Sequence, residues 1–187
     1  MASVPPGAAA QTAVGVGSGP YAVGVDPATD TVYVANSDSG TVSVIDGASN
    51  TVRATVTIGS GPEGVAVDPA TDTVYVANSG SDTVSVIDGA SNTVTATVGV
   101  GSGPDGVGVD PGTDTVYVAN SGSGTVSVID GASDTVTNTV TVGSDPDGVG
   151  VDVATDTVYV ANYGSGTVSV IDGASDTVTA TVTVGSE

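Results

Sequence analysis

The sequence lacks most of the residue types on which catalytic sites depend. Its 187 residues include no cysteine and no histidine, and the single basic residue is Arg53. The absence of cysteine excludes disulfides, thiol nucleophiles and cysteine-based zinc sites. Without histidine or lysine, the usual general bases and activated nucleophiles are missing. We therefore expect a protein that is not an enzyme and that has no cofactor and no metal centre.

Large aromatic side chains are also scarce. Phenylalanine and tryptophan are absent, and the apolar content comes mainly from valine, alanine and isoleucine. β-Branched residues favour strands, and a core without large aromatics suits thin sheets packed face to face. No segment has apolar residues at helical spacing, and no apolar run is long enough to cross a membrane. These absences indicate an all-β protein without membrane insertion.

The charge of the chain is strongly one-sided. Twenty-one acidic residues against one basic residue give a formal net charge of −20. A surface this negative repels phosphate backbones and anionic lipid headgroups, so we expect neither a nucleic-acid partner nor a membrane-surface partner. Cations, positively charged partners and simple solubility are all compatible with this charge.

The main feature of the chain is a sequence repeat that occurs in four copies. The string TVYVAN begins at Thr31, Thr73, Thr115 and Thr157, and TVSVIDGAS follows each copy, always at a 42-residue step. A fixed period near 40 residues, filled with short strand patterns, indicates a repeat architecture. We expect an N-terminal tail at 1–17, which carries part of an outer strand from Gln11 to Gly17, and a repeat domain at 18–187. The four units are 18–59, 60–101, 102–143 and 144–185.

Each unit predicts four antiparallel strands separated by turn signals. In the first unit the strands are 22–26, 31–36, 41–46 and 51–58, with Asp-Pro and Asp-Gly among the turns. The second strand is apolar on both faces and should be buried on both. The fourth alternates apolar and polar residues without interruption from Val52 to Ile58, as an outermost strand with one wet face does. This is the layout of a β-propeller blade, whose first strand lines a central channel.

The repeated strings resemble the YVTN type of β-propeller repeat, in which a Tyr-Val-Thr-Asn strand is followed by a Val-Ser-Val-Ile-Asp strand. The second string is intact at 42–46, 84–88, 126–130 and 168–172, and the first has alanine in place of threonine, as at Ala35. The resemblance covers about nine-tenths of the chain. It implies a β-propeller from an exported or cell-surface protein, without family-wide catalytic residues. Full propellers of this type usually have more blades than four.

Twelve aspartates recur at three positions of the repeat. They are Asp26, Asp68, Asp110 and Asp152, then Asp30, Asp72, Asp114 and Asp156, and finally Asp46, Asp88, Asp130 and Asp172. All lie at turns, where aspartate side chains bond backbone groups, and we interpret them in this way. The alternative is binding of a divalent cation by rings of carboxylates, although no segment matches a calcium-binding loop.

The copies differ mainly at one rim, formed by the inter-blade loops and the turns after the second strands. Loops at the open end of a rigid scaffold can diversify without disturbing packing, so we predict binding there. The candidate binding residues are Tyr21, Glu63, Asp105, Asp147, Tyr163, Asp38, Asp82 and Asp145. Drift on tolerant loops is the alternative explanation of these differences.

The sequence thus predicts a non-catalytic β-propeller scaffold or interaction module that binds a protein or a small ligand. A cation-dependent propeller hydrolase or lactonase is one alternative, and an engineered or excised repeat protein without its own activity is another. We expect the four blades to close into a compact ring. An open half-ring that pairs into an eight-bladed homodimer is the alternative. The family resemblance implies an extracellular or cell-surface location, although the N-terminal residues show no signal-peptide pattern.

Overall fold

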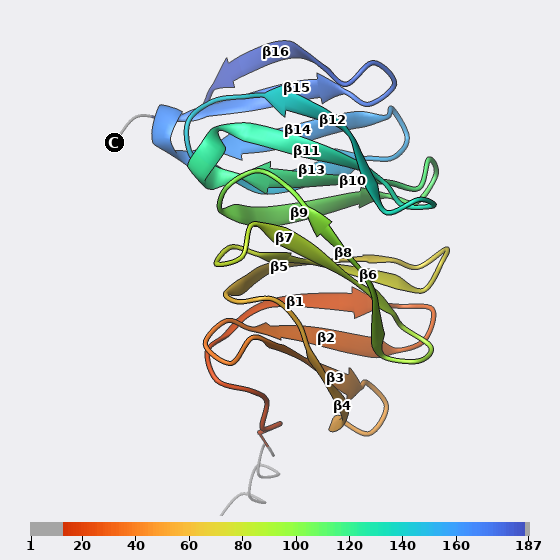
Figure 1. Cartoon of the computed structure of the whole chain (residues 1–187). Coiled ribbons are helices and arrows are strands. Elements are labelled where there is room, and N and C mark those ends of the chain that lie inside the picture. Colours follow the sequence, from red (N-terminus) through yellow and green to blue (C-terminus); the bar gives the residue numbers. More distant parts are fainter. Residues whose placement is uncertain (1–12, 186–187) are drawn as a thin grey trace, which may run out of the picture.

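The computed structural model describes residues 13–185, which form four sheets of four antiparallel strands (Figure 1). Blade 1 contains β1 (Pro20–Asp26), β2 (Thr31–Asn36), β3 (Thr41–Asp46) and β4 (Thr51–Thr57). Blade 2 contains β5 (Pro62–Asp68), β6 (Thr73–Asn78), β7 (Thr83–Asp88) and β8 (Thr93–Gly99). Blade 3 contains β9 (Pro104–Asp110), β10 (Thr115–Asn120), β11 (Thr125–Asp130) and β12 (Thr135–Thr141). Blade 4 contains β13 (Pro146–Asp152), β14 (Thr157–Asn162), β15 (Thr167–Asp172) and β16 (Thr177–Thr183).

Within each sheet the strands lie side by side in sequence order, so every blade is a meander. The first strands β1, β5, β9 and β13 contact one another from blade to blade and form the inner surface of the stack. The predicted all-β class and the four blades of four antiparallel strands are confirmed. Helical structure among the described residues is limited to two 3₁₀ turns, η1 (Ser121–Ser123) and η2 (Tyr163–Ser165). No helix in residues 13–185 is long and apolar enough to cross a membrane.

The turns of a blade are held by their aspartates. Asp26 Oδ1 accepts a hydrogen bond from the Ala28 amide at 2.8 Å, and Asp46 Oδ1 accepts one from the Ser49 amide at 2.7 Å. Asp30 adopts a left-handed φ of 53°, and its carbonyl accepts a bond from the Gly47 amide. Aspartate tolerates this conformation because its short polar side chain bonds locally. These contacts are the local bonding that we inferred from the turn positions.

The outermost strand departs from the predicted alternation at one residue. β4 pairs Ala54 with Val44 but Val52 with Ile45, so Arg53 is an extra residue in a β-bulge. Paired residues share a face of the sheet, and Val52 therefore points away from the face of Ala54. The prediction of one uninterrupted apolar face from Val52 to Ile58 is wrong. The same irregularity recurs in β8, β12 and β16.

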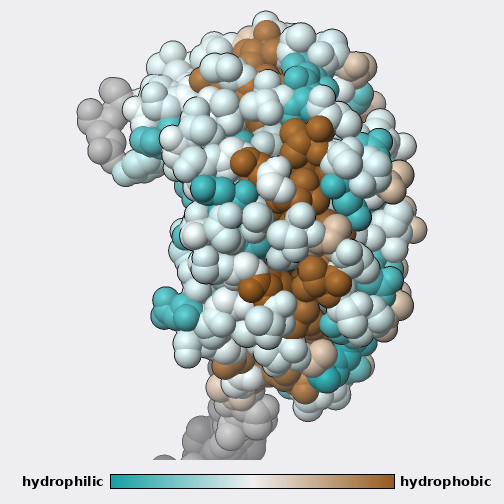
Figure 2. Space-filling model, viewed as in Figure 1, coloured by the Kyte–Doolittle hydropathy of each residue, from teal (hydrophilic) through white to brown (hydrophobic). Residues whose placement is uncertain are grey.

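The hydrophobic core lies between blades. Tyr33 and Val44 of blade 1 pack in one buried cluster with Val74, Val76 and Ile87 of blade 2. Equivalent clusters join blade 2 to blade 3 and blade 3 to blade 4. We call these three interfaces the first, second and third seams. Figure 2 shows apolar residues on one face of the molecule in separate patches along the stack, which fits a core divided into seams.

The stack remains open, and the predicted closed ring of four blades is wrong. Blades 1 and 4 lie at opposite ends of an arc (Figure 1), so the described residues form an open half-ring of a larger propeller. Exposure of the end blades agrees with this arrangement. Tyr159 of blade 4 is 45% exposed, although the equivalent Tyr33 is fully buried in the first seam. Thin 42-residue blades with small side chains do not turn through the right angle that four-fold closure requires.

The N-terminal tail is described only in part. Gln11 and Thr12, where the predicted partial outer strand begins, lie outside the described residues. Residues 13–16 are not part of a strand. The amide of Gly17 donates to Ser43 Oγ at 3.3 Å, as the equivalent Gly101 amide does to Ser127 Oγ, so the end of the tail packs like an inter-blade loop.

Candidate binding site on the inner surface

Four of the eight candidate binding residues share one structural position. Tyr21, Glu63, Asp105 and Asp147 each follow the proline that begins an innermost strand. Because successive innermost strands are neighbours, the repeat brings these side chains together on the inner surface. We call Glu63, Asp105 and Asp147, together with Tyr21, the inner acidic cluster.

The members of this cluster act on one another's ionisation. Burial, followed by repulsion from Asp147 and Glu63, raises the pKa of the Asp105 carboxyl to about 6. The carboxylates of Asp105 and Glu63 also raise the pKa of Tyr21. A carboxyl group with a pKa near 6 exchanges its proton close to neutral pH. A bound positive charge would favour the ionised form and relieve the repulsion.

The other four candidates are held in the loops at the same rim. Asp82 Oδ1 accepts a bond from the Gly103 amide at 2.8 Å, which ties blade 2 to the loop that enters blade 3. Asp38 lies against Gly19, and Asp145 lies against Gly164. Tyr163 is exposed on η2. The structure therefore places Asp38, Asp82 and Asp145 in loop contacts, outside the inner acidic cluster.

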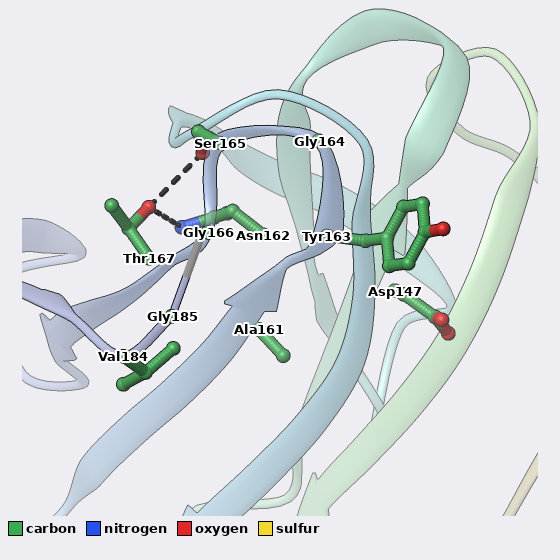
Figure 3. Close-up of a pocket in the computed structure, with 10 residues that line it drawn as sticks. All are labelled: Asp147, Ala161, Asn162, Tyr163, Gly164, Ser165, Gly166, Thr167, Val184 and Gly185. Carbon is green, nitrogen blue, oxygen red and sulfur yellow. Dashed lines mark hydrogen bonds between the residues drawn. The ribbon is translucent and has the colours of Figure 1, made fainter. Parts of the chain in front are cut away.

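A cavity of about 680 Å³ opens at the same rim of blade 4 (Figure 3). Its wall includes Asp147, Ala161, Tyr163 and Val184. In Figure 3 the polar wall is ordered by two bonds to Thr167 Oγ1, one from Asn162 Nδ2 at 3.1 Å and one with Ser165 Oγ at 3.0 Å. Ala161 is exposed here, whereas the equivalent Ala35, Ala77 and Ala119 are fully buried. The cavity thus lies on the side of blade 4 on which, in the other blades, the next blade packs.

The sequence reasoning missed a second acidic arrangement, at the opposite ends of the strands. In the second seam the Tyr75 hydroxyl of blade 2 and the Asp114 carboxylate of blade 3 both lie against Gly131. Asp68 is fully buried nearby, and its Oδ2 has no hydrogen-bond partner among the described residues. Burial, followed by the charges of Asp114 and Asp134, raises the pKa of Tyr75. The recurring aspartates were visible in the sequence, but their meeting across the seam was not.

The first seam differs from the other two because Arg53 lies in it. The guanidinium group of Arg53 counteracts the effects of burial and of Asp72 on the pKa of Tyr33. The second and third seams have Thr95 and Thr137 at the equivalent bulge. Since Arg53 is the only basic side chain of the protein, those two seams have no such countercharge. Among residues 13–185, no group of three acidic side chains is arranged to hold a metal ion.

Comparison with known proteins assigns the chain to a propeller family. A family model described as "Lactonase, 7-bladed beta-propeller" matches residues 88–185, slightly more than half of the chain. The chain belongs to this family of β-propellers. A search of curated proteins found no match.

Solved structures agree on the fold. The hydrazine synthase of Kuenenia stuttgartiensis is similar to this chain, with a TM-score of 0.84 and 27% sequence identity. The alignment covers 95% of this chain but 53% of that one, so this chain spans about half the length of its structural neighbour. In all, 1198 chains of solved structures match, and so widespread a fold does not by itself indicate a function.

Proposed function

We propose that this protein is a non-catalytic β-propeller scaffold whose inner acidic cluster binds a positively charged segment of a partner protein. One observation carries this proposal. Glu63, Asp105 and Asp147 come from three neighbouring innermost strands and meet at a position where the repeats differ, while most of each blade is repeated almost unchanged. Binding sites of repeat proteins are commonly built in this way, from variable positions on a constant frame.

Electrostatics supports a cationic partner. The protein carries a net charge of −20, and its one basic side chain acts on Tyr33 and Asp72 of the first seam, away from the inner acidic cluster. Burial, followed by repulsion from Asp147 and Glu63, raises the pKa of Asp105 to about 6. A lysine or arginine side chain of a partner would therefore find an uncompensated negative site. Complementary charge of this kind speeds association and selects the partner.

A lactonase or related hydrolase is the second candidate. The description of the matching family favours it, and a carboxyl group with a pKa of about 6 could act as a general acid or base. The near-identity of the blades speaks against it, because an active site needs unlike groups that converge on one point. Incubation with simple lactones, with and without added Ca²⁺, distinguishes the candidates. Hydrolysis that is lost in Asp105→Asn would replace the scaffold proposal.

The finer family assignment and the location belong to the same proposal. We infer that the blades are YVTN-type repeats and that the protein works outside the cell or at its surface. The intact Val-Ser-Val-Ile-Asp strings support the first inference. The second rests on that resemblance alone, and recovery of the protein from the cell-surface fraction of its source would test it.

Titration calorimetry with an oligolysine peptide tests the binding proposal. The double variant Asp105→Asn, Asp147→Asn should weaken binding by about tenfold, because it removes two of the three converging carboxylates. The matched control is Asp134→Asn, Asp176→Asn, which removes the same charge from the seams and introduces the residue that blades 1 and 2 carry as Asn50 and Asn92. The control should bind within about twofold of the unmodified protein. Equal losses in both variants would show that the peptide senses only the net charge, and would refute the proposed site.

A further inference from the structure

The two ends of the stack are the two halves of a seam. Blade 4 exposes the side that, in every other blade, packs on the following blade. Val182 is 48% exposed there, whereas the equivalent Val56, Val98 and Val140 are 6% exposed. Blade 1 exposes the opposite side, on which Val23 and Val25 are 61% and 54% exposed. Their equivalents Val65 and Val67 pack against the core of the first seam.

The two exposed faces have complementary shapes. In the first seam Gly24 lies directly against Val65 and Val67, and a Cβ added at position 24 would come within 2.6 Å of a Val65 methyl group. In the third seam Gly108 accommodates Val149 and Val151 in the same way. At the equivalent glycine of blade 4, Gly150, an added Cβ would have no atom of a residue between 13 and 185 within contact distance, its chain neighbours aside. The hollow at Gly150 therefore matches the two valines, Val23 and Val25, that blade 1 leaves exposed.

The cavity at blade 4 belongs to the same face (Figure 3). It lies beside Ala161, the residue that a following blade covers in the other three cases. Correspondingly, Pro20 at the start of β1 is exposed, whereas the equivalent Pro62, Pro104 and Pro146 are buried. The exposed face of blade 4 thus has a hollow, and the exposed face of blade 1 has the residues that fill the equivalent hollow in the seams.

We propose that two copies of this chain close on one another into an eight-bladed ring, with blade 4 of each copy packed on blade 1 of the other. A second copy is the occupant because it repeats an interface that the chain already forms three times, with the same buried apolar residue types at equivalent positions. Each copy is a half-ring that carries both complementary faces, so two identical joints form and the ring closes. Contacts between unlike faces that close in this way give a finite ring instead of a fibre. This inference does not depend on the proposed function.

The charge of the new joints sets how the pairing responds to salt. Each contact between blade 4 of one copy and blade 1 of the other, here called a joint, would resemble a seam. In the second seam Asp68 lies near Asp114 and Asp130, and the equivalent residues at a joint are Asp152 of one copy and Asp30 and Asp46 of the other. No basic residue is present at these positions. Asn50 takes the place that Asp134 and Asp176 occupy in the second and third seams, so each joint carries one carboxylate fewer than those seams. Repulsion remains, and salt screens it. We therefore expect tighter pairing at high ionic strength.

Light scattering coupled to size exclusion tests the pairing. One chain has a mass of 17.6 kDa, and the proposal predicts a species of about 35 kDa that becomes more populated between 0.05 and about 1 M salt. The variant Gly150→Val should reduce the mass to that of one chain, because its side chain occupies the hollow, where an added Cβ meets no atom of the described residues. The matched control is Gly99→Val, since Gly99 also has free space around it but lies on the outermost strand β8. It should leave the dimer intact.

Three results would overturn the proposal. The mass of one chain at every salt concentration would show that the end faces do not pair. A mass that grows without limit with protein concentration would show open-ended assembly instead of a closed ring. A dimer that persists equally in Gly150→Val and Gly99→Val would place the contact elsewhere. Far-UV circular dichroism of both variants verifies that the sheets remain folded, so a loss of pairing cannot be mistaken for unfolding.

Discussion

The seams and the end faces are built from the same residues and differ only in whether a neighbour is present. Tyr75 is buried in the second seam with seven valine, alanine and isoleucine residues of its cluster, whereas Tyr159 of blade 4 is 45% exposed. Both tyrosines stand in the same sequence, Thr-Val-Tyr-Val-Ala-Asn. Burial in this protein is therefore a property of position in the stack, and the stability of each blade depends on having a neighbour, as in other repeat proteins.

The seams also differ among themselves, in charge. The first seam contains Arg53 at the bulge and Asn92 in the following blade, whereas the second contains Thr95 and Asp134 at those positions. The buried apolar residues of the two seams are of the same types at equivalent positions. A repeat can thus keep its packing constant while the charges change, and the following predictions separate the two contributions.

The largest expected effect separates the buried tyrosine from the exposed one. Tyr75→Ala should lower the free energy of unfolding by about 3 to 5 kcal/mol, because it removes a large side chain from a packed core. Tyr159→Ala, with no blade packed upon it, should cost less than about 1 kcal/mol. Both are measured by urea denaturation in the Gly150→Val background, which the pairing proposal predicts to be monomeric. Similar losses for the two tyrosines would contradict the difference between seam and end face.

The next effect concerns pH and the inner acidic cluster. The folded protein raises the pKa of Asp105 to about 6, so folding favours the protonated form and stability falls as the pH rises from about 4 through 6. Asp105→Asn should therefore stabilise the protein at pH 7 by about 1 kcal/mol, a figure that allows for solvent screening of a half-exposed carboxyl group. At pH 4 the substitution should have little effect. A gain that is the same at both pH values would show that ionisation of Asp105 is not its cause.

A smaller effect distinguishes the first seam from the second. Arg53→Thr should destabilise the protein by about 0.5 to 1 kcal/mol at low salt, and Thr95→Arg should stabilise it by a similar amount. Threonine fits the bulge, as Thr95 and Thr137 show, so packing is preserved. Denaturation at about 1 M salt should remove most of both effects. If the cost of Arg53→Thr persists at high salt, the contribution of Arg53 comes from its packing and not from its charge.

The smallest effect is expected at Asp134, where burial followed by Asp114 and Asp130 raises the pKa of the carboxyl group. Asp134→Asn should raise the free energy of unfolding slightly, by about a few tenths of a kcal/mol, because the first seam already has an asparagine, Asn92, at the equivalent position. Urea denaturation of the two proteins measures this difference. Asp38→Asn, which removes the same charge from an exposed loop, is the control. A larger gain from the control would mean that net charge, and not the seam, limits stability.

Most strand bounds of a blade could be predicted from the sequence, because turn-forming residues flank the strands. The strand Thr31–Asn36 was bounded by Asp-Pro-Ala-Thr-Asp and Asn-Ser-Asp-Ser-Gly, and the structure has the same bounds. The bulge at Arg53 was not predictable, because the alternation of Val52, Arg53 and Ala54 reads as a regular strand. Thr95 Oγ1 bonds the Val86 carbonyl at 3.3 Å at this point, but a threonine in a strand gives no warning of it.

Neither the open state of the ring nor the inner acidic cluster could be predicted from the sequence, because both depend on the geometry between blades. The angle between blades results from many small contacts between valines. The sequence does not reveal that angle, and for this reason we wrongly expected a closed ring and named the half-ring only as the alternative. The variable positions of the rim were visible, but only the shared register of innermost strands brings Glu63, Asp105 and Asp147 together. Asp82 varies equally in sequence, yet it is engaged by the Gly103 amide. Binding at any of these residues stays a prediction.

The four blades form an open half-ring, and a distance between the two end blades tests this arrangement most directly. The protein has no cysteine, so spin labels can be placed by Ala48→Cys with Ala174→Cys, in blades 1 and 4, and by Ala48→Cys with Ala90→Cys, in neighbouring blades 1 and 2. These alanines are exposed and occupy equivalent turns. Pulsed electron resonance on labelled chains diluted into unlabelled protein measures distances within one chain. The half-ring predicts a much longer distance for the first pair than for the second, and equal distances would contradict it, because blades 1 and 4 are neighbours only in a closed four-bladed ring.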